Sequence, residues 1–248
     1  MLITVVNPNT TASMTATIGE CARAVASPGT LVEAVTPTMG PASIESHVDE
    51  ALSVPGILEQ IALGEARGTD GYVIACFGDP GIDAAREAAR GPVVGIAEAA
   101  MRAASFLGLG FSVVTTLDRT TGRAWDLAAH YGMGSRCRGV HACEIPVLEL
   151  ETDPDARKIV TEACREAVRT DRSDCVVLGC AGMAKLCRDT SDDIGVPVVD
   201  GVAAGTLFVQ SLVSMGLRTG KVGEFAAPLP KHYTGLLSQF GRSAGSRS

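Results

Sequence analysis

The sequence DGYVIACFG at residues 70–78 recurs in altered form as DCVVLGCAG at residues 174–182. Aligned at the cysteine near the end of each copy, both contain an aspartate, a valine-rich apolar run, a small residue, the cysteine, any residue and a glycine. Each copy is followed by a helical pattern and then by a Pro-Val-Val run, at residues 92–94 and 197–199. An ordered repeat of this length predicts two similar lobes, each built around one copy.

The rest of the chain alternates in the same way between short apolar runs and alanine-rich helical patterns. Short runs rich in valine and isoleucine are typical of strands buried on both faces of a parallel sheet. We expect strands at residues 2–6, 71–75, 93–96, 111–115, 175–178 and 196–199, and helices at residues 83–89, 97–105, 119–131 and 154–170. This alternation predicts an α/β protein of two pseudo-symmetric lobes, each a flavodoxin-like parallel sheet flanked by helices.

Composition predicts a soluble globular protein. The 248 residues are 46% hydrophobic and 20% charged, which is enough apolar material to bury a core. The formal net charge is −7 and basic residues do not cluster, so nucleic acid is not an expected partner. The apolar runs are shorter than the about 18 residues that a membrane span needs, so no membrane partner is expected either. Residues 1–8 lack the features of a signal peptide, and we expect a cytoplasmic location in which the eight cysteines stay reduced.

Cys76 and Cys180, the aligned cysteines of the repeat, are the leading candidates for chemistry. Each follows a buried strand at the carboxyl edge of its sheet, which is where α/β proteins bind ligands. Asp79 and Pro80 match a helix N-cap and first helical position, and a helix N-terminus would lower the pKa of the nearby thiol. Two thiols facing each other across a cleft could remove a proton from one face of a substrate and return one to the other face. The alternative for each is plain packing as a small apolar residue.

The other six cysteines carry no such signal. Four lie in expected helices or strands and fit simple core packing: Cys21, Cys164, Cys175 and Cys187. Two more, Cys137 and Cys143, lie near His130 and His141, but this spacing matches no metal-ligand pattern, so no metal is expected. Glycine motifs for phosphates or dinucleotides are missing, and no lysine has a Schiff-base setting. We therefore expect no cofactor.

Polar residues that follow two further strands are candidates for substrate contact. Asn7 begins the turn Asn-Pro-Asn-Thr-Thr after the first strand, and Thr115 and Thr116 hold the matching position in the second lobe. Such a turn caps the helix that follows it, and the same amide and hydroxyl groups can bind a ligand at the sheet edge. Both roles stay open from the residues alone.

Together these motifs resemble the Asp/Glu racemase superfamily, and within it the hydantoin racemases and allantoin racemases. The resemblance rests on VNPNTT (6–11), PASIE (41–45), ACFGDPG (75–81), GIAEAA (95–100), LGCAGM (178–183) and VPVVD (196–200). It implies that the active site lies in the cleft between two lobes. We expect the first lobe to comprise residues 1–98 and 206–235, the second lobe residues 99–205, and a frayed C-terminal tail residues 236–248.

The resemblance also implies roles for individual residues. In such enzymes the two motif cysteines are a cofactor-independent acid/base pair, which here means Cys76 and Cys180. The pocket residues that it implies are Ser43, Ile44, Phe77, Gly78, Thr115, Thr116, Ala181 and Gly182. Backbone N–H groups of the glycine turns could hold the negative charge that develops on an enolate oxygen.

The neighbours of the two cysteines bear on the substrate. Relatives that act on aspartate or glutamate place polar residues there, whereas this chain has Phe77 and Ala181, which suit a small neutral cyclic ureide such as a hydantoin ring. The C5 proton of that ring is acidified by the adjacent carbonyl. Stretches at residues 22–25, 47–51 and 58–61 look closer to the allantoin branch. The expected reaction is therefore racemisation of 5-substituted hydantoins, with allantoin, a product of purine breakdown, as the natural substrate.

Other functions stay open at this point. Within the superfamily the alternatives are a general hydantoin racemase acting on amino-acid hydantoins, an aspartate or glutamate racemase, and a maleate-type isomerase. A thiol-based ligand or redox sensor is the alternative that is not an enzyme. Alanine-rich exposed helices favour a homo-oligomer.

Overall fold

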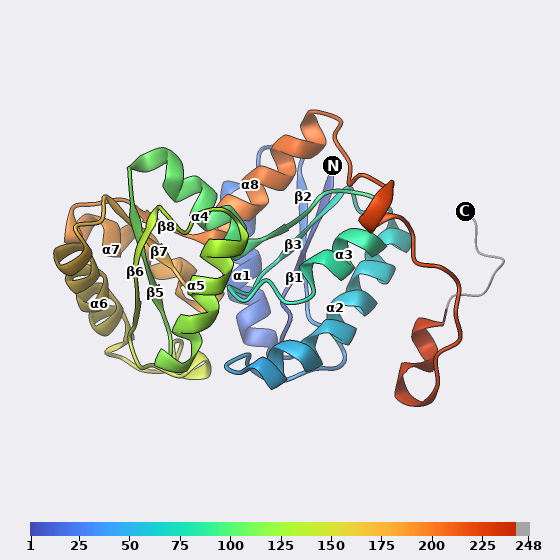
Figure 1. Ribbon diagram of the computed structural model, residues 1–248, viewed down its shortest axis with the longest axis horizontal. Coiled ribbons are helices and arrows are strands. Elements are labelled where there is room, and N and C mark those ends of the chain that lie inside the picture. Colours follow the sequence, from blue (N-terminus) through green and yellow to red (C-terminus); the bar gives the residue numbers. More distant parts are fainter. Residues whose placement is uncertain (242–248) are drawn as a thin grey trace.

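Two four-stranded parallel sheets form the framework of the protein (Figure 1). The computed structural model describes residues 1–241 of the 248. The strands are β1 (Leu2–Val6), β2 (Leu31–Val35), β3 (Gly71–Ile74), β4 (Val93–Gly95), β5 (Phe111–Thr115), β6 (Cys137–Ala142), β7 (Cys175–Leu178) and β8 (Val198–Val199). Their order is β2-β1-β3-β4 in one sheet and β6-β5-β7-β8 in the other, so the two have the same connectivity. The expected α/β fold with two pseudo-symmetric parallel sheets is confirmed.

The two copies of the repeated motif form the inner strands β3 and β7. In the first sheet β3 pairs with β1, with Gly71 opposite Ile3, and in the second β7 pairs with β5, with Cys175 opposite Phe111. All residues of β3, β5 and β7 are buried, which explains their mostly apolar sequences. Because the strands are parallel, the segments after them meet at one edge of each sheet.

The edge strands β2 and β6 are the ones that the sequence pattern does not predict. β2 reads LVEAV with no residue fully buried, and β6 reads CRGVHA with an exposed arginine. Most residues of these two strands are only partly buried or exposed, so no continuous apolar run marks them, whereas the other edge strands, β4 and β8, have no exposed residue.

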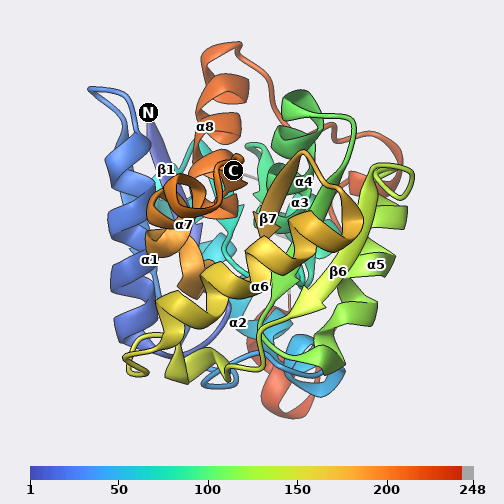
Figure 2. The ribbon, with the colours of Figure 1, turned by 90° about the vertical axis from the view of Figure 1, so that its left-hand side faces the viewer.

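Helices cover both faces of each sheet. In the described chain they are α1 (Ala12–Val25), α2 (His47–Arg67), α3 (Ile82–Ala88), α4 (Ile96–Leu107), α5 (Thr121–His130), α6 (Ala156–Asp171), α7 (Cys187–Ile194) and α8 (Gly201–Ser214). Short 3-10 turns at Asp118–Thr120 and Ala181–Leu186 lead into α5 and α7. Figure 2 shows α6 lying across the second sheet, where it contacts β5, β6 and β7. The pattern does not predict α2, because Pro55 lies inside it and proline normally interrupts a helix.

Helices α4 and α8 pack against each other between the two sheets. α4 follows β4 of the first sheet, but its Met101 belongs to the same apolar cluster as Phe111 and Val177 of the second sheet. α8 follows β8 of the second sheet, but it contacts β1, β3 and β4 of the first. The expected lobe boundaries at residues 98–99 and 205–206 fall inside these two helices. The division into lobes stays a prediction, and this packing supports it.

After α8 the chain forms an extended arm with 3-10 turns at Gly223–Phe225 and Gly235–Phe240 (Figure 1). The arm begins against the first lobe, where the Thr219 N–H donates to the Arg90 carbonyl. The expected frayed tail at residues 236–248 lies partly outside the described residues, and residues 236–240 belong to the second turn. Among residues 1–241, the helices are too short or too polar to cross a membrane.

Candidate active site

A cavity of about 100 Å³ lies between the two lobes, at the carboxyl ends of their strands. Its lining comes from the segments after β1, β3, β5 and β7, together with the loop that leads into α2. This is the edge at which parallel α/β sheets bind ligands. The expected location of the site in the cleft between the lobes therefore coincides with an actual cavity.

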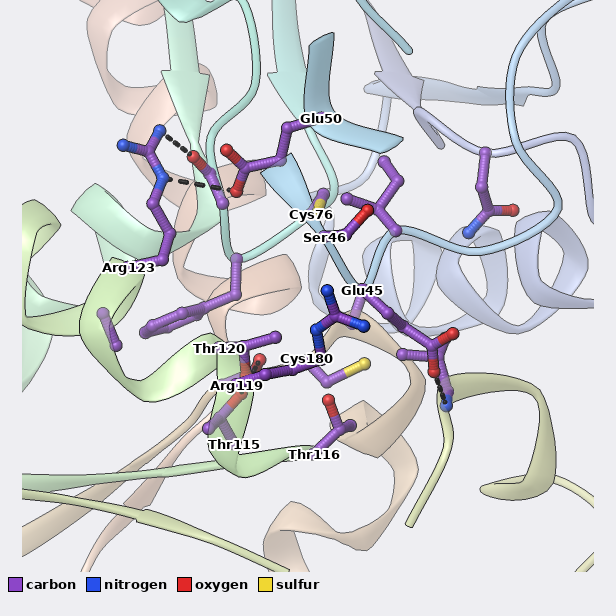
Figure 3. A pocket seen from close by; sticks show the side chains of 18 of the residues that line it. Glu45, Ser46, Glu50, Cys76, Thr115, Thr116, Arg119, Thr120, Arg123 and Cys180 are labelled. Atoms are coloured by element: carbon purple, nitrogen blue, oxygen red, sulfur yellow. Dashed lines mark hydrogen bonds and ion pairs between the residues drawn. The ribbon is translucent and has the colours of Figure 1, made fainter. Parts of the chain in front are cut away.

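Cys76 and Cys180 line this cavity from opposite lobes (Figure 3). Each is the second residue after its inner strand, and each is half-buried. The backbone N–H of Gly78 interacts with the Cys76 sulfur, and that of Gly182 interacts with the Cys180 sulfur. The repeat thus places two thiols, each with a glycine N–H two residues later, in matching positions around one space.

Both thiols have a raised pKa. Burial raises the pKa of Cys76 to about 12, the Gly78 N–H opposes this shift, and the Cys180 thiolate and the Glu50 carboxylate add to it. Burial raises the pKa of Cys180 to about 11, the Gly182 N–H opposes this shift, and the Glu45 carboxylate is among the groups that add to it. Removing water from a thiolate therefore outweighs its backbone hydrogen bond. The expected lowering of the thiol pKa is wrong.

Asp79 does not take the place that the sequence predicts. The N-cap of α3 is Gly81, and Asp79 adopts a left-handed conformation with φ 44°. Its buried carboxylate accepts hydrogen bonds from the N–H groups of Ala97 and Glu98, at 3.0 Å each, in the first turn of α4. The expected role of Asp79 as the N-cap of the helix after Cys76 is therefore wrong, since it binds the N-terminus of a different helix.

Asp79 also joins the two lobes. The Tyr131 hydroxyl, just after α5, donates to the Asp79 Oδ2 at 2.7 Å. Gly95 leaves room for this carboxylate, because a Cβ at that position would lie 2.2 Å from the Asp79 Cγ. Burial raises the pKa of Asp79 to about 6, although its three hydrogen bonds lower it. The loop that carries Cys76 is thus fixed to α4 and to the second lobe.

Four charged side chains line the cavity in addition to the expected residues. Arg123 lies with its Nε 3.3 Å from the Glu50 Oε1 and donates from Nη2 to the Gly78 carbonyl at 2.8 Å. Glu45 accepts hydrogen bonds from the Val147 N–H at 2.8 Å and from Ser43 at 2.9 Å. Arg119 is the fourth. The cavity is therefore more charged than the neighbours of the cysteines indicate. The sequence feature that could have indicated the two arginines as site residues is their position: they lie four residues apart, just after β5.

The expected pocket residues fall into two groups. Those that line the cavity together with the cysteines are Ile44, Phe77, Gly78, Thr115, Thr116 and Ala181. Asn7 does not line it: its buried amide donates to Asn9 and Thr15, and it is Asn9 that reaches the cavity. Ser43 lies behind the lining as the donor to Glu45, and Gly182 lies behind it next to Cys180.

The remaining cysteines lie away from the cavity lining. Cys137, Cys143, Cys164 and Cys175 are buried, and Cys21 and Cys187 are half-buried. His141 is hydrogen-bonded to Asp171 at 2.7 Å. Within residues 1–241, no three His, Cys, Asp or Glu side chains gather closely enough to hold a metal ion.

Comparison with known proteins relates this arrangement to a family. The model of the family described as Asp/Glu/Hydantoin racemase matches residues 3–209. The chain is 45% identical over 244 residues to the hydantoin racemase of Pseudomonas sp. strain NS671, with 98% of each chain covered. Among solved structures it is similar to allantoin racemase from Klebsiella pneumoniae, at 48% identity and a TM-score of 0.95, with 97% of this chain and 99% of the other covered. It is also similar to allantoin racemase from Pseudomonas fluorescens, at 42% identity and a TM-score of 0.91, with 95% and 100% covered. The chain belongs to the Asp/Glu/hydantoin racemase family.

Proposed function

We propose that the protein interconverts the enantiomers of 5-substituted hydantoins, with allantoin as the favoured natural substrate. The observation that carries the proposal is the pair of thiols, Cys76 and Cys180, which line one small cavity from opposite lobes. Inversion at a carbon needs an acid/base group on each face of a planar intermediate, and this arrangement supplies two. The similarity to hydantoin and allantoin racemases supports the choice of ring.

The proposed reaction proceeds in two proton transfers. The thiolate of one cysteine takes the C5 proton, and the electron pair of the C–H bond moves into the ring to give a planar enolate. The thiol of the other cysteine then gives its proton to the opposite face of C5, which leaves that cysteine as the thiolate. The chain supplies both groups, so the proposal invokes no metal or pyridoxal cofactor. The Thr116 hydroxyl lines the cavity and is a candidate donor to the enolate oxygen, whereas the Thr115 hydroxyl already donates to the Gly179 carbonyl.

The raised pKa of both thiols has a consequence for rate. A thiolate of high pKa is a stronger base towards a weakly acidic carbon, but little of it is present at neutral pH. The active form has one thiolate and one thiol, and with pKa values of about 12 and about 11 it is the major form only between these two values.

We therefore expect kcat/KM to rise with pH. Between pH 6 and pH 9 the increase should be about tenfold per unit, because the fraction of thiolate grows by that factor well below its pKa. Initial rates on one enantiomer of allantoin, corrected for spontaneous racemisation at each pH, measure this. A plateau or a maximum near pH 7 would contradict the raised pKa values.

Exchange in deuterated water tests the function itself. A single enantiomer of allantoin, and separately of 5-benzylhydantoin, is followed by polarimetry and by NMR at C5, with an enzyme-free control. We expect rapid loss of rotation with deuterium entering at C5. Turnover of 5-benzylhydantoin in preference to allantoin would favour a general hydantoin racemase. Absence of acceleration with both rings, together with turnover of aspartate, glutamate or maleate, would replace the proposal with one of those activities.

A further inference from the structure

We propose that Arg119 selects hydantoins whose 5-substituent is a ureide over those with an alkyl, aryl or carboxylate substituent. Arg119 lies in the 3-10 turn Asp118–Thr120 directly after β5, and its side chain lines the cavity. Figure 3 shows the guanidinium directed into the cavity, between the sulfur atoms of Cys76 and Cys180 in this view. The inference rests on the proposed function and concerns its substrate class.

Within the described part of the chain, Arg119 differs from Arg123, the other cavity arginine, in having no hydrogen-bond or ion-pair partner. Arg123, four residues further on, is held by the Glu50 carboxylate and the Gly78 carbonyl. The Arg119 side chain makes no hydrogen bond or ion pair to any of residues 1–241. The pKa of Asp49, in the first turn of α2, is lowered mainly by its hydrogen bond from Ser46 and to a smaller extent by the charge of Arg119, which places Arg119 near the opposite lobe. A guanidinium has five donors and no acceptor, so the group that completes this site must offer an acceptor oxygen.

The surroundings of Arg119 define what else that group must offer. The cavity also contains Glu45 and Glu50, whose carboxylates can only accept. A ureide carries a carbonyl oxygen for Arg119 and several N–H donors for such acceptors, and it has no charge. The donors and acceptors of a ureide thus match this mixed lining.

The other substituents fit less well, each for a different reason. A phenyl or alkyl group offers Arg119 no acceptor while displacing water from it, which leaves a charged donor without a partner. A carboxylate would pair with Arg119 but would face Glu45, Glu50 and the nearby Asp49, and like charges repel. The lining therefore favours a neutral substituent that both donates and accepts.

Substituting Arg119 should change selectivity rather than general activity. For Arg119→Leu we expect kcat/KM on allantoin to fall about tenfold or more, mainly through KM, since hydrogen bonds to charged groups are of this strength. On 5-benzylhydantoin the same variant should be at least as active as the wild type, because the charge that an aryl substituent leaves unpaired is gone. Arg119→Lys should recover part of the loss on allantoin. The matched control is Arg218→Leu, which removes an exposed arginine in the segment after α8.

Three outcomes of this series overturn the inference. An equal loss on both substrates would mean that Arg119 supports the general architecture of the site. An unchanged preference would mean that it takes no part in recognition. Faster wild-type turnover of 5-(2-carboxyethyl)hydantoin than of allantoin, lost in Arg119→Leu, would mean that it recognises carboxylates. In each of these cases hydantoins are still racemised, so the proposed racemisation of hydantoins stands, and only the third outcome removes allantoin as the favoured substrate.

A binding measurement separates the inference from catalysis. Calorimetric titration of allantoin and of 5-benzylhydantoin into Cys76→Ser/Cys180→Ser, with and without Arg119→Leu, reports recognition in a protein that cannot turn substrate over. We expect Arg119→Leu to weaken only allantoin binding, by about tenfold. If the wild type racemises no hydantoin at all, the turnover measurement overturns the proposed function. If allantoin binds equally with and without Arg119, the binding measurement overturns the inference about Arg119.

Discussion

Replacing either Cys76 or Cys180 by serine should slow racemisation of allantoin by about 10³-fold, with the fold retained. Each thiol is proposed to supply one of two obligatory proton transfers, and general acid/base groups typically contribute factors of 10² to 10⁴. A hydroxyl is a far weaker acid than a thiol and cannot hold the anion that the reaction needs. Polarimetry on each pure enantiomer measures the loss.

Deuterium exchange in the single variants gives a sharper result. With one thiol left, a proton removed from C5 can return only to the same face. Each variant should therefore exchange the C5 proton of one enantiomer without inverting it, and the two variants should choose opposite enantiomers. Cys21→Ser is the matched control, because Cys21 is half-buried on α1 and outside the cavity lining. Turnover near that of the wild type in either single variant would rule out the two-thiol mechanism.

Replacing Asp79 by alanine should destabilise the protein by about 3 kcal/mol at pH 7, because the change removes a helix-terminal acceptor and leaves a buried hydroxyl unpaired. The groups left without an acceptor are the N–H groups of Ala97 and Glu98 and the Tyr131 hydroxyl. kcat should also fall, since the loop carrying Cys76 loses its attachment to α4. Urea unfolding measures the free energy. Tyr131→Phe, which removes one bond only, should cost about 1 kcal/mol.

The same carboxyl makes the difference between Asp79→Ala and the wild type depend on pH. Its pKa is about 6 in the folded protein, above the ordinary value of 3.8. A raised carboxyl pKa contributes stability that is fully present below the unfolded value and is lost as pH rises through the folded one. The destabilisation caused by Asp79→Ala should therefore shrink between pH 4 and pH 7. Asp83→Ala, which removes an exposed carboxylate on α3, is the matched control. An Asp79→Ala protein as stable as Asp83→Ala at pH 7 would contradict the proposed anchoring.

How much the sequence predicts depends on where a residue lies in the sheet. The inner strands β1, β5 and β7 begin and end at the predicted residues, because burial on both faces requires apolar runs that are visible in one dimension. The edge strands β2 and β6 do not stand out, since their composition is that of ordinary exposed chain. Similarly, the two candidate thiols are predictable because the motif occurs twice.

The charged part of the site shows the limit of reading a sequence. Glu45, Glu50, Arg119 and Arg123 resemble ordinary surface residues until the loop before α2 and the turn after β5 bring them to the same cavity. Asp79 followed by proline matches a helix N-cap locally, but the left-handed turn aims its carboxylate at α4 instead. Contacts between segments far apart in the chain decide both cases, and no local pattern encodes them.

The crossing of α4 and α8 has a consequence for how substrate enters. Each of these helices follows the last strand of one sheet and packs against the other sheet, so each half of the chain completes the apolar core of its counterpart. The two halves are therefore packed into each other's cores, and separating them as two rigid bodies would expose both cores to water. We therefore expect the spacing of the two sulfur atoms to be fixed on folding. Entry of the substrate ring into the cavity then depends on small movements of side chains at the mouth of the cavity.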